Sequence, residues 1–181
     1  MAQQQSVGLL ILTKLPELGV VAILQARGTF NHERIAPANF PGICQVTCHG
    51  DVQVDKQERL IPALEREWGE ESGRRLSDVA PYFRSKMVEL ARVDTPDKLV
   101  VTYGLYIENP EFLDFLKLNA STGGIRPLTR EGVGSILQVE PALHKTRGVP
   151  DQRTNAMFSD EIEAVRKAFD ILAPDAGAEA P

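Results

Sequence analysis

Three glutamates, Glu67, Glu70 and Glu71, are spaced so that one helix would bring their carboxylates together. Each residue of an α-helix advances about 100°, which places the three side chains within an arc of roughly 100°. Like charges at i,i+3 and i,i+4 cost roughly 0.2–0.5 kcal/mol per pair, and more beside a dry core. Arg66 can reach Glu70 at i,i+4, but one guanidinium cannot neutralise three carboxylates. We therefore expect a bound cation at this cluster.

The donor chemistry of the cluster favours a hard divalent cation. Carboxylate oxygens without a neighbouring histidine or thiolate indicate Mg²⁺ or Mn²⁺ rather than zinc, and Mg²⁺ commonly takes substrate phosphates into its coordination shell. The alternative interpretation is a solvated acidic face, which is what most glutamate clusters on helices are. Glu71 counts against this alternative, because it falls nearly in line with the apolar residues Leu60 and Leu64.

The helix that carries the cluster is expected over residues 60–72. Pro62 is tolerated only in the first turn of a helix, and Gly73 is a suitable terminator just beyond the end. Trp68 belongs to an apolar stripe that neighbours the carboxylates, so this side of the helix should face the core.

Strand-like segments surround this helix. Apolar runs on either side of a breaker-rich segment predict an opening hairpin or a strand pair, and a polar loop at 28–42 leads into a third strand. Two more strands follow the helix, separated by a turn signal at 94–97. The expected strands cover residues 7–12, 20–24, 43–48, 86–91 and 99–107.

The C-terminal part of the chain predicts one further long helix. Region 108–155 is rich in glycine and proline, so we expect loops around short elements there. Ser159 offers an N-cap for an amphipathic helix with acidic residues in its first turn. The apolar positions of this helix recur at helical spacing and are Ile162, Val165, Ala168, Phe169 and Leu172. Residues 1–173 should form a single domain, followed by a disordered tail at 174–181.

Of the 181 residues, 43% are hydrophobic and 25% charged, which suits a soluble globular protein. A formal net charge of -5 and the lack of a basic run argue against duplex DNA or RNA as a partner. No segment approaches the roughly 18 apolar residues of a membrane span, and the start has no basic leader. We expect a cytoplasmic protein without a membrane partner, and leave a homodimer open.

The residues around the acidic helix resemble the Nudix box, G-x5-E-x7-R-E-U-x-E-E-x-G-U, in which U is a bulky apolar residue. Two positions depart from it. Val52 stands at the first glycine, with Gly50 nearest, which implies a loop longer by two residues, and Arg74 stands at the last apolar position. Seven of the nine specified positions agree, and these are Glu58, Arg66, Glu67, Trp68, Glu70, Glu71 and Gly73.

This resemblance covers about residues 7–172 and implies an α/β fold, a Nudix-type α/β/α sandwich with a mixed β-sheet. It also implies Mg²⁺-dependent (or Mn²⁺-dependent) hydrolysis of a small-molecule substrate, at the diphosphate linkage of a nucleoside diphosphate joined to another moiety. Arg66 would orient a glutamate through an ion pair, and Glu58 would brace the loop against the helix. The implied catalytic residues are Glu67, Glu70, Glu71, Arg66 and Glu58, and the implied metal ligands are Glu67, Glu70, Glu71 and Gly50.

Residues outside the box could complete such a site, although ordinary surface exposure is the alternative for each. A later loop could add a metal-binding carboxylate, for which the candidates are Glu108, Glu111 and Glu131. Basic side chains could meet phosphate or carboxylate groups of the substrate, and the candidates are Arg27, Arg34 and Arg126, with Lys145 and Arg147.

Two other hypotheses remain. Isopentenyl-diphosphate isomerase shares the fold and has a proline-glycine strand that leads to a Cys and a His, as Cys48 and His49 do here, with Cys48 as the acid. Those isomerases use several histidines as metal ligands, and this chain has three in all. Cys44 and Cys48 should otherwise lie about 13 Å apart on one face of a strand, as reduced core residues. The second hypothesis is a Nudix-like regulatory domain that binds a nucleotide without hydrolysing it.

Overall fold

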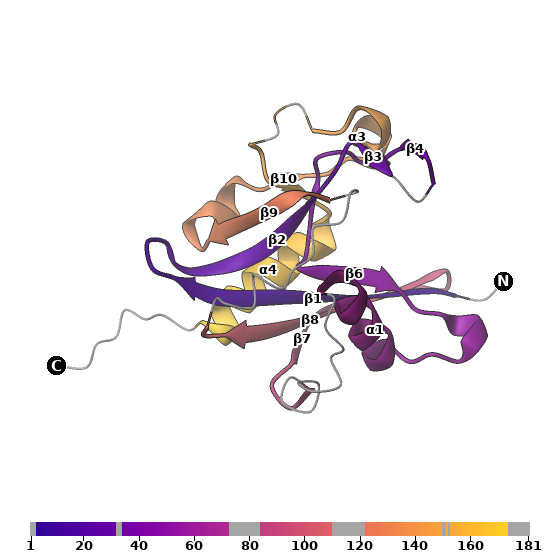
Figure 1. Cartoon of the computed structure of the whole chain (residues 1–181), viewed down its shortest axis with the longest axis horizontal. Helices are drawn as coiled ribbons and strands as arrows, with labels where there is room; N and C mark the ends of the chain where they lie inside the picture. The colour runs from indigo at the N-terminus through magenta and orange to yellow at the C-terminus, as the bar shows by residue number, and fades with distance from the viewer. Residues whose placement is uncertain are drawn as a thin grey trace.

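In the part of the chain that the structure describes, a mixed sheet of seven strands forms the centre, with helices on both of its faces (Figure 1). The computed structural model describes residues 3–31, 34–72, 84–109, 122–149, 151 and 153–173. β1 (Gln4–Leu15) lies inside the sheet, parallel to β8 (Lys98–Ile107) and antiparallel to β2 (Gly19–Arg27). The other strands of the sheet are β5 (Cys44–Gln45), β6 (Cys48–Asp51), β7 (Val88–Asp94) and β9 (Thr122–Thr129).

The opening hairpin and the two strands after the acidic helix are confirmed. β1 and β2 pair from Ile11–Ile23 to Leu15–Gly19, and Gly19 adopts a positive φ of 70° at the turn, where glycine avoids steric strain. β7 begins two residues later than predicted and ends three residues later, and it pairs antiparallel with β8. Because β1 and β8 run parallel while the other pairs are antiparallel, the sheet is mixed as predicted.

Alternate residues of β1 supply two separate cores. Val7, Leu9 and Ile11 pack with buried residues of α1 (Leu60–Ser72), including Leu64 and Trp68. Leu10 and Leu12, which alternate with these residues along the strand, pack with α4 (Ser159–Leu172) on the other face. The layers are therefore helix, sheet and helix, and the bounds predicted for the acidic helix are confirmed.

α4 carries the predicted apolar stripe, but Ser159 is not its N-cap. The cap is Phe158, whose backbone is extended, and Ile162 N–H donates to the Phe158 carbonyl at 3.0 Å. The helix thus begins one residue earlier than a Ser159 cap would allow, a shift typical of helix ends. All five stripe residues are buried or pack against the α4-side core.

The strand predicted at 43–48 is wrong as a single strand. β5 pairs with β2 and β6 pairs with β1, so the chain changes partner strands at Val46 and Thr47. Thr47 Oγ1 accepts from Ile11 N–H at 2.8 Å and donates to the Ile23 carbonyl at 2.6 Å, which places it where β1 and β2 part. We call residues 44–51 the wedge.

The wedge also overturns the expected placement of the two cysteines. Cys44 belongs to the α4-side core, whereas Cys48 belongs to the α1-side core. They therefore face opposite sides of the sheet. Both are buried and free, as the prediction of reduced core residues required.

Region 108–155 contains more regular structure than predicted. β9 was missed because Gly124 and Pro127 look like breakers, yet Pro127 pairs opposite Ile23 on a strand that joins the sheet only through β2. An edge strand tolerates proline because one side of it needs no donor. Region 108–155 also contains η4 (Glu131–Ser135), β10 (Leu137–Gln138) and α3 (Pro141–Arg147).

Elsewhere in the described residues, the short elements are β3 (Phe30–Asn31), β4 (Ala36–Pro37), η1 (Val54–Lys56) and β11 (Ala156–Met157).

Among the helices that the structure describes, none is long and apolar enough to cross a membrane. The predicted tail at 174–181 lies outside the described residues.

Candidate functional site

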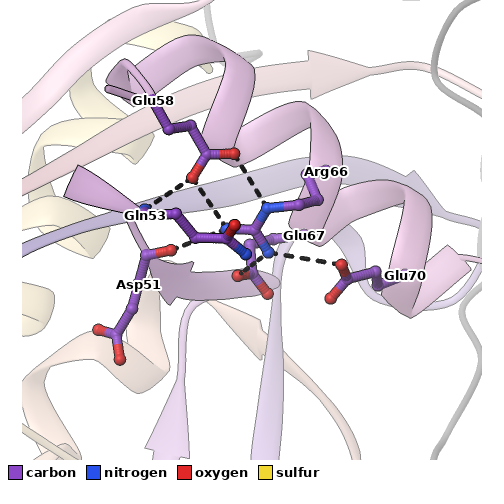
Figure 2. A network of polar contacts seen from close by, with 6 residues as sticks. All are labelled: Asp51, Gln53, Glu58, Arg66, Glu67 and Glu70. Atoms are coloured by element: carbon purple, nitrogen blue, oxygen red, sulfur yellow. Dashed lines mark hydrogen bonds and ion pairs between the residues drawn. The ribbon is translucent and has the colours of Figure 1, made fainter. Parts of the chain in front are cut away.

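Arg66 is the centre of a polar network on α1 (Figure 2). Its Nε donates to Glu58 Oε1 at 2.9 Å, and its Nη2 donates to Glu58 Oε2 at 3.1 Å and to the backbone carbonyl of Asp51 at 2.8 Å. Its Nη1 donates to Glu67 Oε1 at 2.6 Å and reaches Glu70 Oε1 at 3.4 Å. One guanidinium therefore joins the helix, the preceding loop and the end of β6.

The bidentate ion pair between Arg66 and Glu58 links the loop before α1 to the helix. Glu58 Oε2 also accepts the backbone N–H of Gln53 at 2.8 Å, at the start of the η1 turn. Arg66 lowers the pKa of Glu58 from its ordinary value, chiefly through the side-chain hydrogen bond. Glu58 in turn raises the pKa of Arg66. Both groups are therefore favoured in their charged forms, and Glu58 contacts both the loop at Gln53 and the helix at Arg66.

Glu67 lies directly against the backbone of Gly50. A Cβ atom placed on Gly50 would be 1.9 Å from Glu67 Cδ, so no residue with a side chain fits at this position without moving the carboxylate. Gly50 pairs with Val7 in the sheet, and therefore faces α1 together with the Val7 side chain. A strand position thus forms the cradle for a helix carboxylate.

Gly50 takes the place against Glu67, while the box position at Val52 has another role. Val52 is buried in the α1-side core, and its N–H donates to the Gln5 carbonyl at 2.9 Å. Between this position and α1 the chain forms η1. Gly50, and not the residue at position 52, therefore lies against Glu67 in this chain.

Glu67 is half-buried, and burial raises its pKa, opposed by the hydrogen bond from Arg66. The ionised form therefore depends on nearby positive charge. Arg66 supplies one such charge, and Glu70, which Nη1 also reaches, is largely exposed at the rim. The arrangement can present carboxylate oxygens to a ligand or cation while the guanidinium holds Glu67 in place.

The carboxylate oxygens of Glu67 and Glu70 are of the type that binds a hard divalent cation. Glu67 and Glu70 both direct an oxygen at Arg66 Nη1, and Gly50 leaves room for the Glu67 carboxylate. The backbone of Glu71 is part of α1, but its side chain lies outside what the structure describes. Among the described side chains, no three of the His, Cys, Asp and Glu residues are grouped to hold a metal ion. The fit therefore rests on two carboxylates and the glycine cradle.

The basic residues predicted to meet substrate belong to other elements. Arg27, at the end of β2, donates to the Asn39 carbonyl at 3.3 Å, and Arg126, in β9, donates to the Thr154 carbonyl at 3.0 Å. Arg34 is exposed in the turn between β3 and β4. The structure does not bring these three side chains into the Arg66 network as far as its described contacts extend.

The remaining candidates lie on exposed parts of the chain. Lys145 and Arg147 are in the last turn of α3, Glu108 follows β8, and Glu131 starts η4. Glu111 is outside the described residues. The proposal of a later metal-binding carboxylate thus gains no geometric support from the described positions.

Two contacts were not predicted from the sequence, one within the Arg66 network and one on the other face of the sheet. The Asp51 carbonyl accepts from Arg66, and a backbone contact of this kind leaves no signal in residue types. Glu161 is one of the acidic residues predicted for the first turn of the C-terminal helix, yet it is 7% exposed, with one oxygen that accepts the Val46 N–H at 3.4 Å. A glutamate two residues after Ser159 and beside Ile162 could have suggested burial, because it adjoins the apolar stripe.

Comparison with known proteins identifies the fold. No family profile matches the chain, and no curated protein matches it. A mutT/nudix family protein from Listeria innocua superposes with a TM-score of 0.60 at 17% identity, over 95% of both chains. The Nudix domain of Shewanella oneidensis NrtR, complexed with ADP ribose, gives 0.57 at 15% identity, over 95% of this chain and 90% of that one. A MutT/nudix family protein from Enterococcus faecalis gives 0.53 at 15% identity, over 94% and 62%.

The chain therefore has the Nudix fold. This confirms the predicted α/β/α sandwich with a mixed sheet, and it confirms the Nudix resemblance at the level of the fold.

Proposed function

We propose that this protein is a Nudix-type pyrophosphohydrolase, which hydrolyses a diphosphate linkage in a nucleoside diphosphate joined to another moiety, with Mg²⁺ or Mn²⁺. The observation that carries the proposal is the Glu67 carboxylate, set against Gly50 and held by Arg66, in a chain with the Nudix fold. A structural ion pair alone would not require a glycine cradle on a neighbouring strand.

The residues of the chain divide the work as follows. Glu67 and Glu70 would hold the cation, with Glu71 as a third carboxylate and the Gly50 carbonyl beside them. Arg66 keeps Glu67 in one orientation, and Glu58 keeps Arg66 in place. When bound, the cation would neutralise the diphosphate oxygens and lower the pKa of a water for in-line attack. Phosphate contacts are proposed for Arg27, Arg34 and Arg126.

An isomerase role for Cys48 is disfavoured by its surroundings. The side chain is 1% exposed and belongs to the α1-side core, where no substrate can reach it without opening the fold. His49 faces the opposite side of the sheet from Cys48, because neighbouring strand residues alternate. Burial lowers the pKa of His49, which disfavours the charged imidazolium form. The two side chains therefore do not form one acid–base pair.

A regulatory domain that binds a nucleotide without turnover is the second candidate, because the NrtR Nudix domain was solved with ADP ribose. Calorimetry with ADP-ribose, in Mg²⁺ and in chelator, separates the candidates. A hydrolase shows continuing heat from turnover in Mg²⁺, whereas a binding domain shows saturable heat and recovers intact ADP-ribose.

The proposed activity is tested by measuring released phosphate or nucleoside monophosphate with Mg²⁺ and Mn²⁺. The substrates are ADP-ribose, a nucleotide sugar, a dinucleotide, coenzyme A and a nucleoside triphosphate. We expect Glu67→Gln and Glu71→Gln each to lower turnover on the order of a hundredfold or more, since changes next to a metal ligand already cost about 10–100-fold.

Glu65→Gln is the matched control. Glu65 lies on the same helix and pairs with Arg84 instead of Arg66, so its loss should leave turnover near that of the wild type. Wild-type turnover in Glu67→Gln, on a substrate that the unmodified chain hydrolyses, would remove the basis of the proposal.

A further inference from the structure

Glu161 is a buried carboxyl on the face of the sheet opposite α1. It lies in the first turn of α4 and is 7% exposed. Its Oε1 accepts the Val46 N–H at 3.4 Å, and its Oε2 is buried with no hydrogen-bond partner in the described part of the chain. Burying a carboxyl group without hydrogen bonds to both oxygens destabilises the fold, so its burial calls for a structural explanation.

The backbone N–H of Val46 requires an acceptor, because it lies where the wedge passes from β2 to β1. β5 ends at Gln45 and β6 begins at Cys48, so Val46 is outside both ladders. The residue is buried, and a buried N–H without an acceptor destabilises the conformation that holds it there. Glu161 provides the acceptor from α4.

Val46 is connected to the Glu67 contact through a short segment of the wedge that is fixed by hydrogen bonds. Thr47 is bonded through its hydroxyl to β1 and β2, and Gln25 Nε2 donates to its carbonyl at 2.8 Å. Three residues after Thr47, Gly50 pairs with Val7 and receives the Glu67 carboxylate. A shift of the wedge by a fraction of an ångström would therefore move the surface against which Glu67 rests.

We infer that Glu161 is a positioning residue for Glu67, acting across the sheet by fixing the wedge at Val46. This inference rests on the proposed function only for its kinetic consequence, since the effect on the wedge is a property of the fold.

The charges around Glu161 suit a carboxyl that accepts a hydrogen bond without needing an ion pair. Burial, and then Asp160 in the same turn, raise its pKa to about 7, against the lowering effect of the backbone N–H groups of Val46 and Phe158 and of Arg27 on β2. Cys44 on β5 has its own pKa raised by burial, and Arg126 on β9 opposes that shift. In its protonated form Glu161 retains a carbonyl oxygen for Val46.

His49 on β6 is influenced by two of the charged residues that also act on Glu161. Arg27 lowers and Asp160 raises the pKa of His49, although burial is the main cause of its lowered value. The charged residues that act on Glu161 are therefore one cation, Arg27, and one anion, Asp160, and Glu161 in turn helps to raise the pKa of Cys44.

The experiment compares Glu161→Gln, which keeps an acceptor oxygen, with Glu161→Leu, which removes it. Glu163→Gln is the control, because Glu163 is exposed two residues along the same helix and pairs with Lys167. Amide hydrogen exchange at Val46 and Gly50 reports on the wedge, and kcat and KM are measured on whichever compound of the substrate panel is hydrolysed. If Glu161→Leu does not fold, Glu161→Asp replaces it, because the shorter side chain withdraws the carboxylate from Val46.

We expect exchange at both amides to accelerate on the order of tenfold in Glu161→Leu. We also expect kcat to fall by a similar factor, with KM within about twofold of the wild type. Glu161→Gln and Glu163→Gln should match the wild type in all three measurements. The inference is overturned if exchange at Gly50 stays at the wild-type rate in Glu161→Leu, or if Glu161→Gln behaves like Glu161→Leu. A chain that hydrolyses nothing would refute the proposed function, whereas the exchange rates would still decide the role of Glu161.

Discussion

Glu67 and Glu161 are carboxyls on opposite faces of one sheet, and the difference between them lies in their partners. Burial raises the pKa of both. Glu67 is bonded to the Arg66 guanidinium at 2.6 Å, whereas Glu161 is bonded to a backbone N–H and has one oxygen without a partner in the described structure. The guanidinium opposes the rise in the pKa of Glu67, whereas the pKa of Glu161, which has no bonded cation, is raised to about 7. The same residue type thus has a side-chain cation as its partner on one face and a backbone N–H on the other, which matches the chemical role proposed for Glu67 and the positioning role inferred for Glu161.

The largest effect on turnover is expected from Gly50→Ala, which changes only the α1 side of the sheet. The new Cβ would overlap Glu67 Cδ, and because that atom ends a flexible side chain, the carboxylate can move without displacing the helix. Turnover should fall on the order of a hundredfold, with a melting temperature within a few degrees of the wild type.

Gly134→Ala is the control for this variant, since a Cβ there meets no atom within 4 Å. A Gly50→Ala protein with wild-type turnover would show that the cradle does not set the position of Glu67. A protein that fails to fold would show that the helix itself depends on this glycine.

Arg66→Ala should have the next largest effect, and should reduce activity more than stability. The ion pairs of Arg66 are partly exposed and contribute roughly 0–1 kcal/mol to folding. Loss of the orienting contact to Glu67 should lower turnover by roughly 10–100-fold. Steady-state kinetics and urea unfolding of the same preparation provide the two measurements. Equal losses in both would contradict the orienting role.

The two faces should also differ in the sign of their pH dependence. The pKa of Glu161 is raised from 4.5 to about 7 in the fold, so its contribution to stability is highest below pH 4.5 and is lost as the pH rises through 7. The pKa of Glu58 is lowered, so its contribution is present above pH 4.5 and is lost as the pH falls. We expect the stability difference between Glu161→Gln and the wild type to grow in favour of the variant between pH 4.5 and 7.

Thermal melting at half-unit pH steps measures this difference. Glu58→Gln provides the opposite test, because its deficit relative to the wild type should shrink as the pH falls below 4.5. Parallel curves for the wild type and Glu161→Gln across this range would mean that Glu161 titrates as an ordinary exposed glutamate.

The smallest effect is expected from removing residues 174–181, and this prediction comes from the sequence alone. The deleted segment has no large apolar residue to anchor it. The end of α4 keeps its own support, since Arg130 Nη2 donates to the carbonyls of Phe169 and Ala173, both at 2.6 Å. The truncated chain should melt within about 2 °C of the full chain and keep its turnover. A decrease of several degrees would indicate that the tail docks on the domain.

The sequence by itself determined the elements that depend on local signals. The α1 helix follows from Pro62 near its start and its apolar stripe, and its bounds were predicted correctly. The meeting of Arg66 with Glu70 follows from helical spacing, and α4 follows from a regular apolar repeat. The Nudix resemblance, carried by residues close together in the chain, led to the correct fold class although no family profile matches.

Only the tertiary structure decided how the wedge, the cradle and the second carboxyl are arranged. The wedge divides a segment that looks like one strand, because β1 and β2 part beyond Ile11 and Ile23 and Thr47 fills the gap. Gly50 takes the position against Glu67 because pairing with Val7 turns it toward α1. Glu161 is buried because α4 packs its first turn over Val46, 115 residues earlier in the chain. Contacts between residues so far apart depend on which strands pair, and periodicity within one element carries no information about that pairing.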